Sequence, residues 1–392
     1  MTEWSLRPLS DLTENLDSRR VPIKEADRRP GPYPYYGASG IVDYVDDYLF
    51  EGLHLLIAED GENLRTRKLP IAFLADGRFW VNNHAHIVRA NGEADTRFLL
   101  YAMLVADVTS YLSGSTMPKL TQGNLNRIPI LAPDKRNQQA IASVLGALDD
   151  KIELNRRMNE TLEAMARAIF KDWFVDFGPT RAKMEGRAPY LAPDIWSLFP
   201  DRLDEEGKPE GWRYWPLQQI IDFKSGQNWL SQYRVESSQI PTFGANGRIG
   251  FSSNFIDEGR VIFVGKIGSC GSINEYNGKF WATNNTYYVK QPSTKYIEHA
   301  RCLLRSIDWV PFIGGSSNPY MPLKNFDHLQ CLMAADAIHE AFETIVGALR
   351  SFIEHCEQEN ASLAATRDFL LPKLMSGEVR VKDAEKLVGE AI

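Results

Sequence analysis

The second half of this chain repeats the first half, and this repeat constrains the fold more than any local pattern does. At an offset of 201 residues, Ser115-Thr116-Met117-Pro118 aligns with Ser316-Ser317-Asn318-Pro319, and Leu145-Gly146-Ala147-Leu148 aligns with Val346-Gly347-Ala348-Leu349. Because this period is too long for a solenoid, it predicts a duplicated unit made of one domain and one helix. Two such units in one chain are expected to be related by a pseudo-twofold axis.

Upstream of these segments the repeat continues in patches, with a different offset. Gly37-Ala38-Ser39-Gly40 corresponds to Gly244-Ala245-Asn246-Gly247 at an offset of 207, whereas Phe79-Trp80 corresponds to Phe280-Trp281 at an offset of 201. The first copy therefore has about six extra residues (207 less 201), for which the polar run at residues 59–68 is a plausible place. A shared frame with different residues between its fixed points predicts two modules with one scaffold and two specificities. Gene duplication followed by drift would give the same pattern.

Composition limits the kind of protein this can be. A chain of 392 residues, of which 44% are hydrophobic, can form about two to four soluble domains. No signal peptide opens the sequence and no apolar run approaches the ~20 residues of a membrane span, so we expect a cytoplasmic protein without membrane contact. The four cysteines occur singly, which argues against a zinc ribbon or a disulfide framework.

The net charge of −7 is unfavourable for nucleic-acid binding, because phosphate contacts need Lys and Arg. It does not exclude such binding, since a local patch makes the contact and partner subunits can supply part of the positive surface. Charge alone does not suggest DNA.

Two β-rich domains are predicted, at residues 1–134 and 212–334. Both contain short apolar runs separated by Gly, Asn-Gly or Asp-Gly turns, which indicate strands, and late in each domain one segment has helical spacing. These patterns predict an α+β fold for each domain. Residues 178–211 are rich in Pro, Gly and charge, which predicts an irregular linker between them. Residues 377–392 are charged and are expected to form a frayed tail.

A long amphipathic helix is predicted after each domain, at residues 135–177 and 335–376. The apolar positions step by four and three along ten successive positions, as in a coiled-coil seam, and the second seam follows from the first by adding 201. If a pseudo-twofold axis relates the helices, they pack antiparallel. The seam positions singled out are Leu145, Leu148, Ile152, Asn155, Asn159, Leu162, Val346, Leu349, Ile353, Asn360 and Leu363.

Polar residues interrupt both seams near the middle. Asn155 and Asn159 in one seam and Asn360 in the other would meet in an antiparallel pair, where hydrogen bonds between them could fix the register. The alternative is that this part of the seam faces solvent. Arg367 falls on the second seam and has no evident role in it.

The motifs that carry catalysis are missing from the sequence. It has no G-x-x-x-x-G-K-[ST] phosphate loop and no G-x-G-x-x-G after a strand, and Ser317-Asn318-Pro319-Tyr320 lacks the second Pro of the Asn-Pro-Pro-Tyr loop of adenine methyltransferases. His84 and His86 could suggest a metal, but a satisfied structural pair is the better interpretation. Because no nucleophile, base or metal set occurs twice, the duplication indicates recognition and assembly, with no catalytic residue, metal or cofactor in this chain.

The chain resembles the DNA-specificity subunits of type I restriction-modification systems. The resemblance rests on GSTMPKL at 114–120, the helix entry at 133–139, IASVLGALDDKIELN at 141–155, FKDWF at 170–174 and the echo LLPKLMSGE at 370–378. It implies two target-recognition domains, each reading one half of an asymmetric, bipartite site in double-stranded DNA. It also implies that the helices set the distance between half-sites and dock two methyltransferase subunits, which use S-adenosylmethionine, and that motor-nuclease subunits join them and use ATP and Mg.

Residues that contact DNA have to be inferred from their chemistry, because base readout needs Arg, Lys, Asn, Gln, Ser or Thr on exposed loops. The candidates are Arg19, Arg20, Ser39, Arg65, Arg67, Lys68, Ser115, Thr116, Lys119, Asn246, Arg248, Lys266, Ser269, Ser316 and Asn318. Two alternatives stay open at this point. One is a pseudo-symmetric coiled-coil scaffold that binds proteins and reads no DNA, which the pI of about 5.6 favours, and the other is a self-contained methyltransferase or nuclease.

Overall fold

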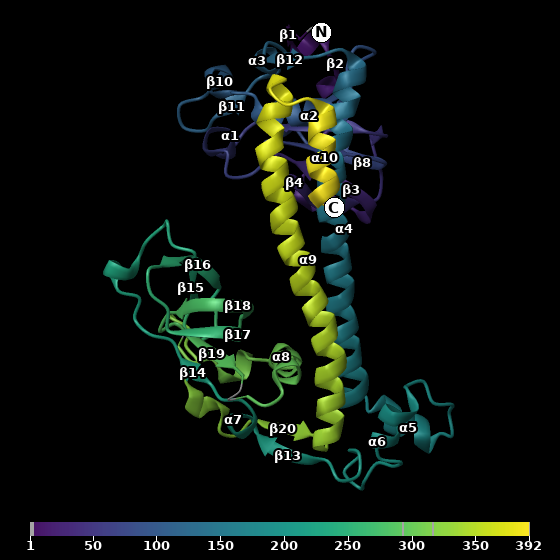
Figure 1. Ribbon diagram of the computed structural model, residues 1–392, viewed down its shortest axis with the longest axis vertical. Coiled ribbons are helices and arrows are strands. Elements are labelled where there is room, and N and C mark those ends of the chain that lie inside the picture. Colours follow the sequence, from purple (N-terminus) through teal and green to yellow (C-terminus); the bar gives the residue numbers. More distant parts are fainter. Residues whose placement is uncertain (1–3, 292–293, 316, 392) are drawn as a thin grey trace. The chain divides into compact units, whose positions relative to one another are not determined.

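The computed structural model describes residues 4–291, 294–315 and 317–391, and its contacts divide the chain into two compact units. Unit 1 is Met1–Arg157 with Cys356–Ile392, and unit 2 is Met158–His355. The long helices α4 (Lys135–Phe170) and α9 (Asp336–Ser376) each pass from one unit to the other (Figure 1). Each unit therefore contains one domain, the first half of one long helix and the second half of the other.

The domain of unit 1 is built from short sheets. The ribbon pairs β1 (Ser5–Pro8) with β12 (Pro129–Ala132), and the hairpin pairs β10 (Leu112–Ser113) with β11 (Lys119–Leu120). One four-stranded sheet has the order β2 (Thr13–Asn15), β9 (Ala85–Ala90), β6 (His54–Ala58), β7 (Ala72–Ala75). The other has the order β4 (Gly40–Val45), β3 (Pro30–Gly37), β8 (Arg78–Val81), β5 (Phe50–Glu51). The helices are α1 (Asn63–Thr66), α2 (Thr96–Val105) and α3 (Gln122–Asn126).

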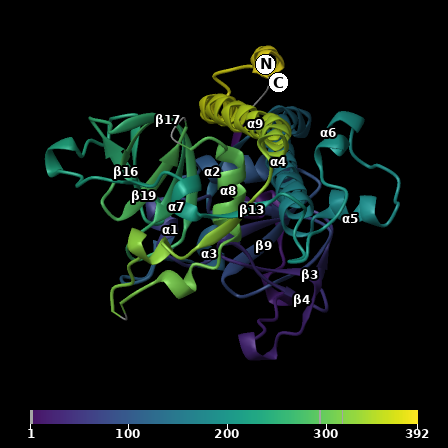
Figure 2. The same cartoon turned by 90° about the horizontal axis from the view of Figure 1, so that it is seen from below.

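The domain of unit 2 has the same connections in one larger sheet. Its ribbon pairs β13 (Arg213–Pro216) with β20 (Gln330–Met333). The six-stranded sheet has the order β14 (Lys224–Ser225), β19 (Thr286–Lys290), β17 (Asp257–Gly265), β18 (Ile273–Ala282), β15 (Ile240–Gly244), β16 (Gly247–Ser252). Besides α7 (Leu217–Ile220), the domain has α8 (Ile297–Ser306), which lies between the sheet and α9 (Figure 2). Both domains are α+β, as predicted.

Equivalent hydrogen bonds show that the two domains share one scaffold. The Leu9 amide donates to the Ile128 carbonyl over 2.9 Å, and the Leu217 amide donates to the Leu329 carbonyl over the same distance. The side-chain amide of Asn124 donates to the Tyr111 carbonyl, and that of Asn325 donates to the Phe312 carbonyl. The repeat in the sequence is thus a repeat of backbone geometry.

In unit 1 the second half of α9 packs antiparallel on the first half of α4. Leu363 and Leu370 join Leu145, Leu148 and Ile152 in one buried apolar cluster. Burying a Leu side chain contributes about 1.5–3 kcal/mol relative to exposure, so these residues supply much of the adhesion between the helices.

Polar groups fix the register of this helix pair. The Asn155 side chain, which is fully buried, donates to Asn360 Oδ1 over 3.0 Å and to a carboxylate oxygen of Glu359 over 2.6 Å. Arg367, unexplained by the sequence, pairs with Asp149 over 2.8 Å, and Asp149 also accepts from the Tyr101 hydroxyl of the domain. The predicted Asn pair therefore forms, and Arg367 belongs to a polar cross-link between both helices and α2.

In unit 2 the first half of α9 packs antiparallel on the second half of α4. Phe342 and Val346 are buried with Phe170 in an apolar cluster, while Leu162 and Leu349 of the predicted seam are half-buried. Asn159 differs from the register-setting role expected for it, because its buried Oδ1 has no hydrogen-bond partner among the described residues.

A dense ion-pair network also joins α8 to the helix pair of unit 2. Arg301 of α8 pairs with Glu298 and with Glu163 of α4, each at 2.9 Å, and Arg350 of α9 pairs with Glu163 at 2.9 Å. Arg301 is 3% exposed, so these carboxylates compensate a guanidinium that is shielded from water.

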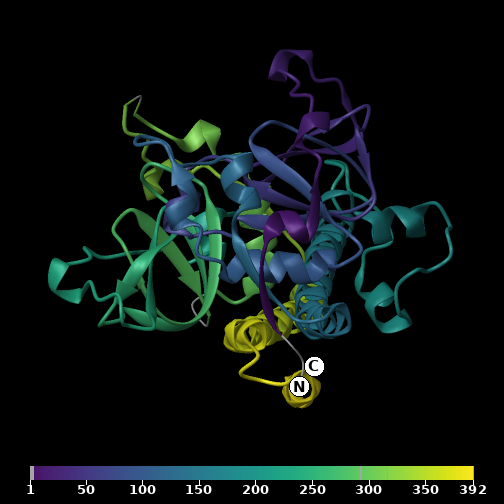
Figure 3. The same cartoon turned by 90° about the horizontal axis from the view of Figure 1, so that it is seen from above.

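Two segments are more ordered than predicted. The linker contains α5 (Gly178–Met184) and α6 (Pro193–Leu198), and Phe199 packs edge-on against Trp173 at 5.0 Å. The predicted frayed tail instead forms α10 (Val381–Ala391), which lies beside α9 in unit 1 (Figure 3). Its Ala384 and Val388, four residues apart on one face, are buried in the core of unit 1.

After Phe170, α4 continues as a π-helical turn at Lys171–Val175. None of the described helices combines the length and apolar character that crossing a bilayer requires.

Candidate nucleic-acid interface

Three loops meet at one edge of the domain in unit 1, and we call them the platform: residues 59–71, 82–84 and 112–120. Backbone hydrogen bonds hold them together. The Glu59 amide donates to the His84 carbonyl over 2.9 Å, the Leu120 amide donates to the Glu59 carbonyl over 2.8 Å, and the Gly61 amide donates to the Pro118 carbonyl over 3.1 Å. The loops cannot move independently while these bonds persist.

The same platform occurs in unit 2, formed by residues 266–272 and 283–285 and by the described residues 313–315 and 317–321. The Lys266 amide donates to the Asn285 carbonyl over 2.8 Å, and the Met321 amide donates to the Lys266 carbonyl over 2.9 Å. The Gly268 amide donates to the Pro319 carbonyl over 2.8 Å. These partners are the residues of unit 1 shifted by 207 or 201, so the six extra residues of the first copy lie after Gly61, in the segment that forms α1.

Different side chains support this shared backbone. In unit 1 the buried ring of His86 lies between Asp17 and the Leu120 carbonyl, with Nδ1 2.5 Å from Asp17 Oδ2 and Nε2 2.6 Å from the carbonyl oxygen. In unit 2 the Tyr287 hydroxyl donates to the Met321 carbonyl over 3.1 Å. His86 is thus a structural residue, as the sequence analysis expected, whereas His84 is exposed.

Two arginines predicted to contact DNA are engaged inside the domain. Arg20 is half-buried, with Nη1 2.7 Å from Glu59 Oε2 and 2.6 Å from the Ala85 carbonyl. Arg67, at a positive φ of 53°, donates to the Leu104 and Ala106 carbonyls. We therefore assign both to structural roles: their partners lie far away in sequence, so the sequence alone could not reveal them.

Ion pairing also limits the charge that the platform offers. Burial raises the pKa of Glu59, but hydrogen bonds from Arg20 and Lys119 outweigh burial and bring that pKa below its usual value. Lys119 Nζ lies 3.1 Å from Glu59 Oε1, and Arg65 pairs with Glu62 at 2.9 Å. Lys119 and Arg65 are exposed, so they can still exchange these partners for phosphates.

The remaining candidates divide by exposure. Exposed side chains in both units are those of Arg19, Ser39, Lys68, Ser115, Thr116, Asn246, Arg248, Ser269 and Asn318. Lys266 is half-buried with its ammonium over the Tyr287 ring, and the Arg19 guanidinium lies over the Phe50 ring. Ser316 lies outside the described residues.

Each platform gathers several of these candidates. Ser115, Thr116 and Lys119 lie on its hairpin in unit 1, and Asn318 lies on the equivalent hairpin in unit 2. The turn that carries Asn246 joins the platform of unit 2, because the Ser272 hydroxyl donates to the Ala245 carbonyl. In the described residues, no three His, Cys, Asp or Glu side chains are arranged to hold a metal ion.

Exposed residues of the 82–84 turn and its equivalent were missed by the sequence analysis. Asn83 and His84 are exposed in unit 1, as are Asn284 and Asn285 in unit 2. Asn83 and Asn284 correspond at the offset of 201, which is the signal in the repeat that could have identified this turn. Tyr320, 47% exposed, was likewise missed.

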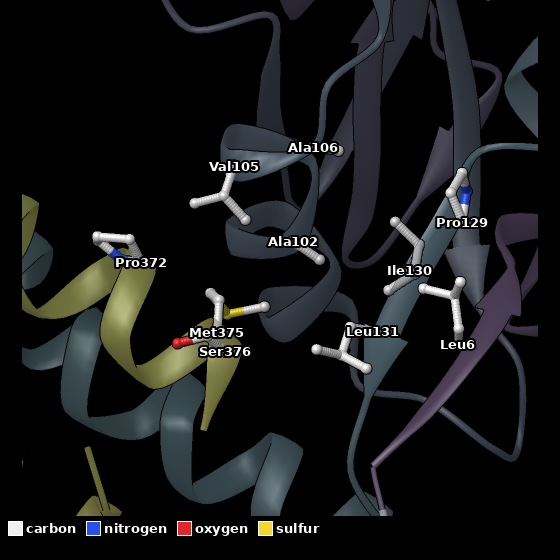
Figure 4. A pocket seen from close by; sticks show the side chains of 10 residues that line it. All are labelled: Leu6, Ala102, Val105, Ala106, Pro129, Ile130, Leu131, Pro372, Met375 and Ser376. Atoms are coloured by element: carbon white, nitrogen blue, oxygen red, sulfur yellow. The ribbon is translucent and has the colours of Figure 1, made fainter. Parts of the chain in front are cut away.

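A separate apolar hollow of about 270 Å³ lies beside the ribbon of unit 1 (Figure 4). Side chains of α2 and α9, including Val105, Pro372 and Met375, face Leu6 and Leu131 of the ribbon across it. Leu6 and Leu131 are cross-strand neighbours and are 67% and 36% exposed. Such an apolar lining without a charged group suits a protein side chain better than a cofactor.

The ribbon of unit 2 exposes one apolar side chain at the same place. Tyr214 pairs with Leu332 in the strand register and is 57% exposed, whereas Leu332 is half-buried against the apolar cluster of unit 2. Exposure of the first ribbon strand at Leu6 and Tyr214 is therefore duplicated, but the full apolar pair is not.

The two units define a class of protein: two α+β recognition modules on one scaffold, each joined to an antiparallel helix pair and each carrying its own surface side chains. Residues 1–164 match the family described as the type I restriction modification DNA specificity domain. The chain is 26% identical over 423 aligned residues to the type I restriction enzyme MjaIX specificity subunit of Methanocaldococcus jannaschii, covering 97% of this chain and 94% of that relative.

Two further comparisons agree. A stretch of 94 residues, 22% of this chain and 20% of the relative, is 40% identical to the type I restriction enzyme HindI specificity subunit of Haemophilus influenzae. The fold is similar to the crystal structure of the type I restriction-modification system S subunit from M. genitalium, with a TM-score of 0.62 and 19% identity, covering 95% of this chain and 96% of that one. By these comparisons the chain is similar, over nearly its whole length, to specificity subunits of type I restriction-modification systems.

Proposed function

We propose that this chain reads an asymmetric, bipartite site in double-stranded DNA, one half-site with each module. The observation that carries the proposal is the platform: its backbone hydrogen bonds are the same in both units, while its exposed side chains differ. A fixed backbone with variable donors and acceptors is what direct readout of two different base sequences requires. A duplicated catalytic site would instead repeat its side chains.

The long helices are proposed to set the spacing between the half-sites. An α-helix of 36 residues, the length of α4, is about 54 Å long at ~1.5 Å per residue. At ~3.4 Å per base pair this corresponds to about 16 base pairs. Two short half-sites and a spacer of unread bases fit within this length.

Catalysis is proposed to belong to other subunits. Two methyltransferase subunits with S-adenosylmethionine would modify adenine, and motor-nuclease subunits with ATP and Mg would cleave unmodified DNA. An exposed apolar side chain at the same ribbon position of each unit, Leu6 and Tyr214, supports two like partners, because a surface that occurs twice in one chain can bind two copies of one protein.

Selection from random duplex DNA tests the proposed function. The chain, purified with its methyltransferase subunit, is expected to enrich one motif with two defined halves and a spacer of constant length. Enrichment of a single uninterrupted motif, or of none, would contradict bipartite reading. In the second case a scaffold that binds only proteins would become the better explanation.

A further inference from the structure

We propose that His84 in unit 1 and Asn285 in unit 2 occupy one equivalent reading position and determine which base pair each module accepts there. The inference rests on the proposed function and makes it more specific, since it assigns one residue per module to a single base pair. The two positions share a fixed backbone and an exposed side chain, and they differ in their chemical environment.

The backbone at both positions is anchored on two sides. Before the turn, the Asn82 amide donates to the Tyr36 carbonyl and the Thr283 amide donates to the Phe243 carbonyl, both over 2.9 Å. At the turn itself, the carbonyls of His84 and Asn285 accept from the loop of residues 59–71 and its equivalent. A side chain on such a turn is presented at a defined place, so little conformational entropy is lost when it binds.

The His84 side chain is oriented by a carboxylate. Its Nδ1 lies 2.8 Å from Asp60 Oδ2, and the imidazole is 54% exposed while Asp60 is 23% exposed. Because a carboxylate accepts hydrogen bonds, Nδ1 donates to Asp60, and in the neutral ring Nε2 is then an acceptor on this exposed side chain. An acceptor in the major groove pairs with an exocyclic amino group, which adenine and cytosine present. Asp60 acts as a positioning residue for this ring.

The equivalent position in unit 2 has neutral chemistry. Asn285 replaces His84, and Ile267 replaces Asp60, as the offsets of 201 and 207 show. A β-bridge joins Asp60 to Lys119 in unit 1, and another joins Ile267 to Tyr320 in unit 2. Lys119 and Tyr320 are therefore at equivalent positions too. Around the same turn, unit 2 thus has Ile267 in place of the acidic Asp60 and Tyr320 in place of the basic Lys119.

This environment fits an A·T pair. The exposed Asn285 side chain makes no hydrogen bond to any described residue, and a carboxamide matches the N6 and N7 groups of adenine in two parallel bonds. Half-buried Ile267, on the adjacent loop, is apolar and suits the methyl group of thymine. The geometry thus assigns Asn285 to adenine at one position of the second half-site.

Selection from random duplexes with variant complexes tests the assignment. For Asn285→Ala we expect the preference for adenine at one position of the second half-site to fall by about 5- to 150-fold, the range of one bidentate contact of ~1–3 kcal/mol, with the first half-site unchanged. For His84→Ala and Asp60→Ala we expect relaxed preference at one position of the first half-site only. Ser253→Ala, an exposed polar change at the opposite end of β16 from the Asn246 turn, is the matched control and should change neither half-site.

Each outcome has a distinct meaning. If the unaltered complex yields a bipartite motif and Asn285→Ala and His84→Ala keep every base preference, the assignment is wrong while the proposed function stands. If the variants weaken binding equally on all sequences, the residues contact phosphate and the assignment is again wrong. If the unaltered complex yields no bipartite motif, it is the proposed function that fails.

Discussion

Acidification should weaken unit 2 through His339, a histidine that is buried among aromatic rings. Its ring stacks on Tyr296 at 4.8 Å and on Phe174 at 5.1 Å, and its Nε2 accepts from the Ala334 amide. Its Nδ1 is buried without a hydrogen-bond partner among the described residues. The His299 ring lies 4.4 Å away, so a charge on His339 would also face a second histidine.

The size of this effect follows from the difference in the pKa of His339 between the folded and the unfolded chain. Burial lowers the pKa of His339 to about 4, against 6.5 for an exposed histidine. The folded state therefore favours the neutral form, and the stability that this preference provides is present above pH 6.5 and is lost progressively as pH falls toward 4. At ~1.36 kcal/mol per unit, the 1.5 units between pH 6.5 and 5 correspond to about 2 kcal/mol.

Other groups titrate in the same range, so a matched variant is needed. Burial raises the pKa of Glu343 to about 6, which favours the folded state as pH falls and opposes the histidine effect. His339→Gln removes the titrating ring and keeps an acceptor for the Ala334 amide. Urea unfolding, followed by fluorescence of Trp173 and Trp212 in the same apolar cluster, measures the free energy of unfolding of both proteins at pH 7.5 and pH 5.

We expect the unaltered chain to lose about 2 kcal/mol more than His339→Gln between these two pH values. The comparison of pH dependences cancels the general cost of the substitution, and it also cancels the contribution of Glu343. Equal pH dependences in the two proteins would refute the reasoning, because they would mean that folded His339 binds its proton as readily as the unfolded chain does.

Three further predictions concern the helix pair, the ribbon and the modules. Asn155→Ala removes a buried side chain that donates to Asn360 Oδ1 and to Glu359, and it should lower the free energy of unfolding by about 1–3 kcal/mol, measured by urea unfolding; an unchanged value would remove the register role. Leu6→Glu places a charge beside the apolar hollow and should weaken binding of the methyltransferase subunit at least 10-fold in titration calorimetry, with an unchanged circular dichroism spectrum; unchanged affinity would place the partner elsewhere. Exchange of residues 212–334 for another module should alter one half-site in motif sequencing, and changes in both halves would contradict independent reading.

The helix seam and the repeat could be predicted from the sequence because their signals are periodic. Leu145, Leu148 and Ile152 recur at steps of three and four, and burial of one helix face imposes that spacing whatever lies opposite. Internal comparison of the two copies also located the shared frame without knowledge of the sheets. Asn124 and Asn325, which correspond at the offset of 201, make the same side-chain hydrogen bond in both domains.

Individual polar roles could not be predicted, because each depends on a partner distant in sequence. Arg20 and Arg65 look alike as exposed cations in a polar context, yet Arg20 meets Glu59 and the Ala85 carbonyl in the folded domain. Arg367 likewise had no role until Asp149 was found opposite it. The charge of residues 377–392 predicts a frayed tail. The short apolar face of α10, which is buried in the core of unit 1, is a weaker signal in the sequence.

The division of the long helices between the units has a consequence for biosynthesis. Unit 2 is one continuous stretch, Met158–His355, so all of it is synthesised before residues 356–392. Unit 1 begins with the first residues and needs the last ones, since Leu363, Leu370 and Leu374 complete its core. The module translated first is thus the one that finishes folding last, and a nascent chain carries an open apolar surface on α4 until the second half of α9 has been made. A frameshift after residue 355 would therefore damage the amino-terminal module and spare the carboxy-terminal one.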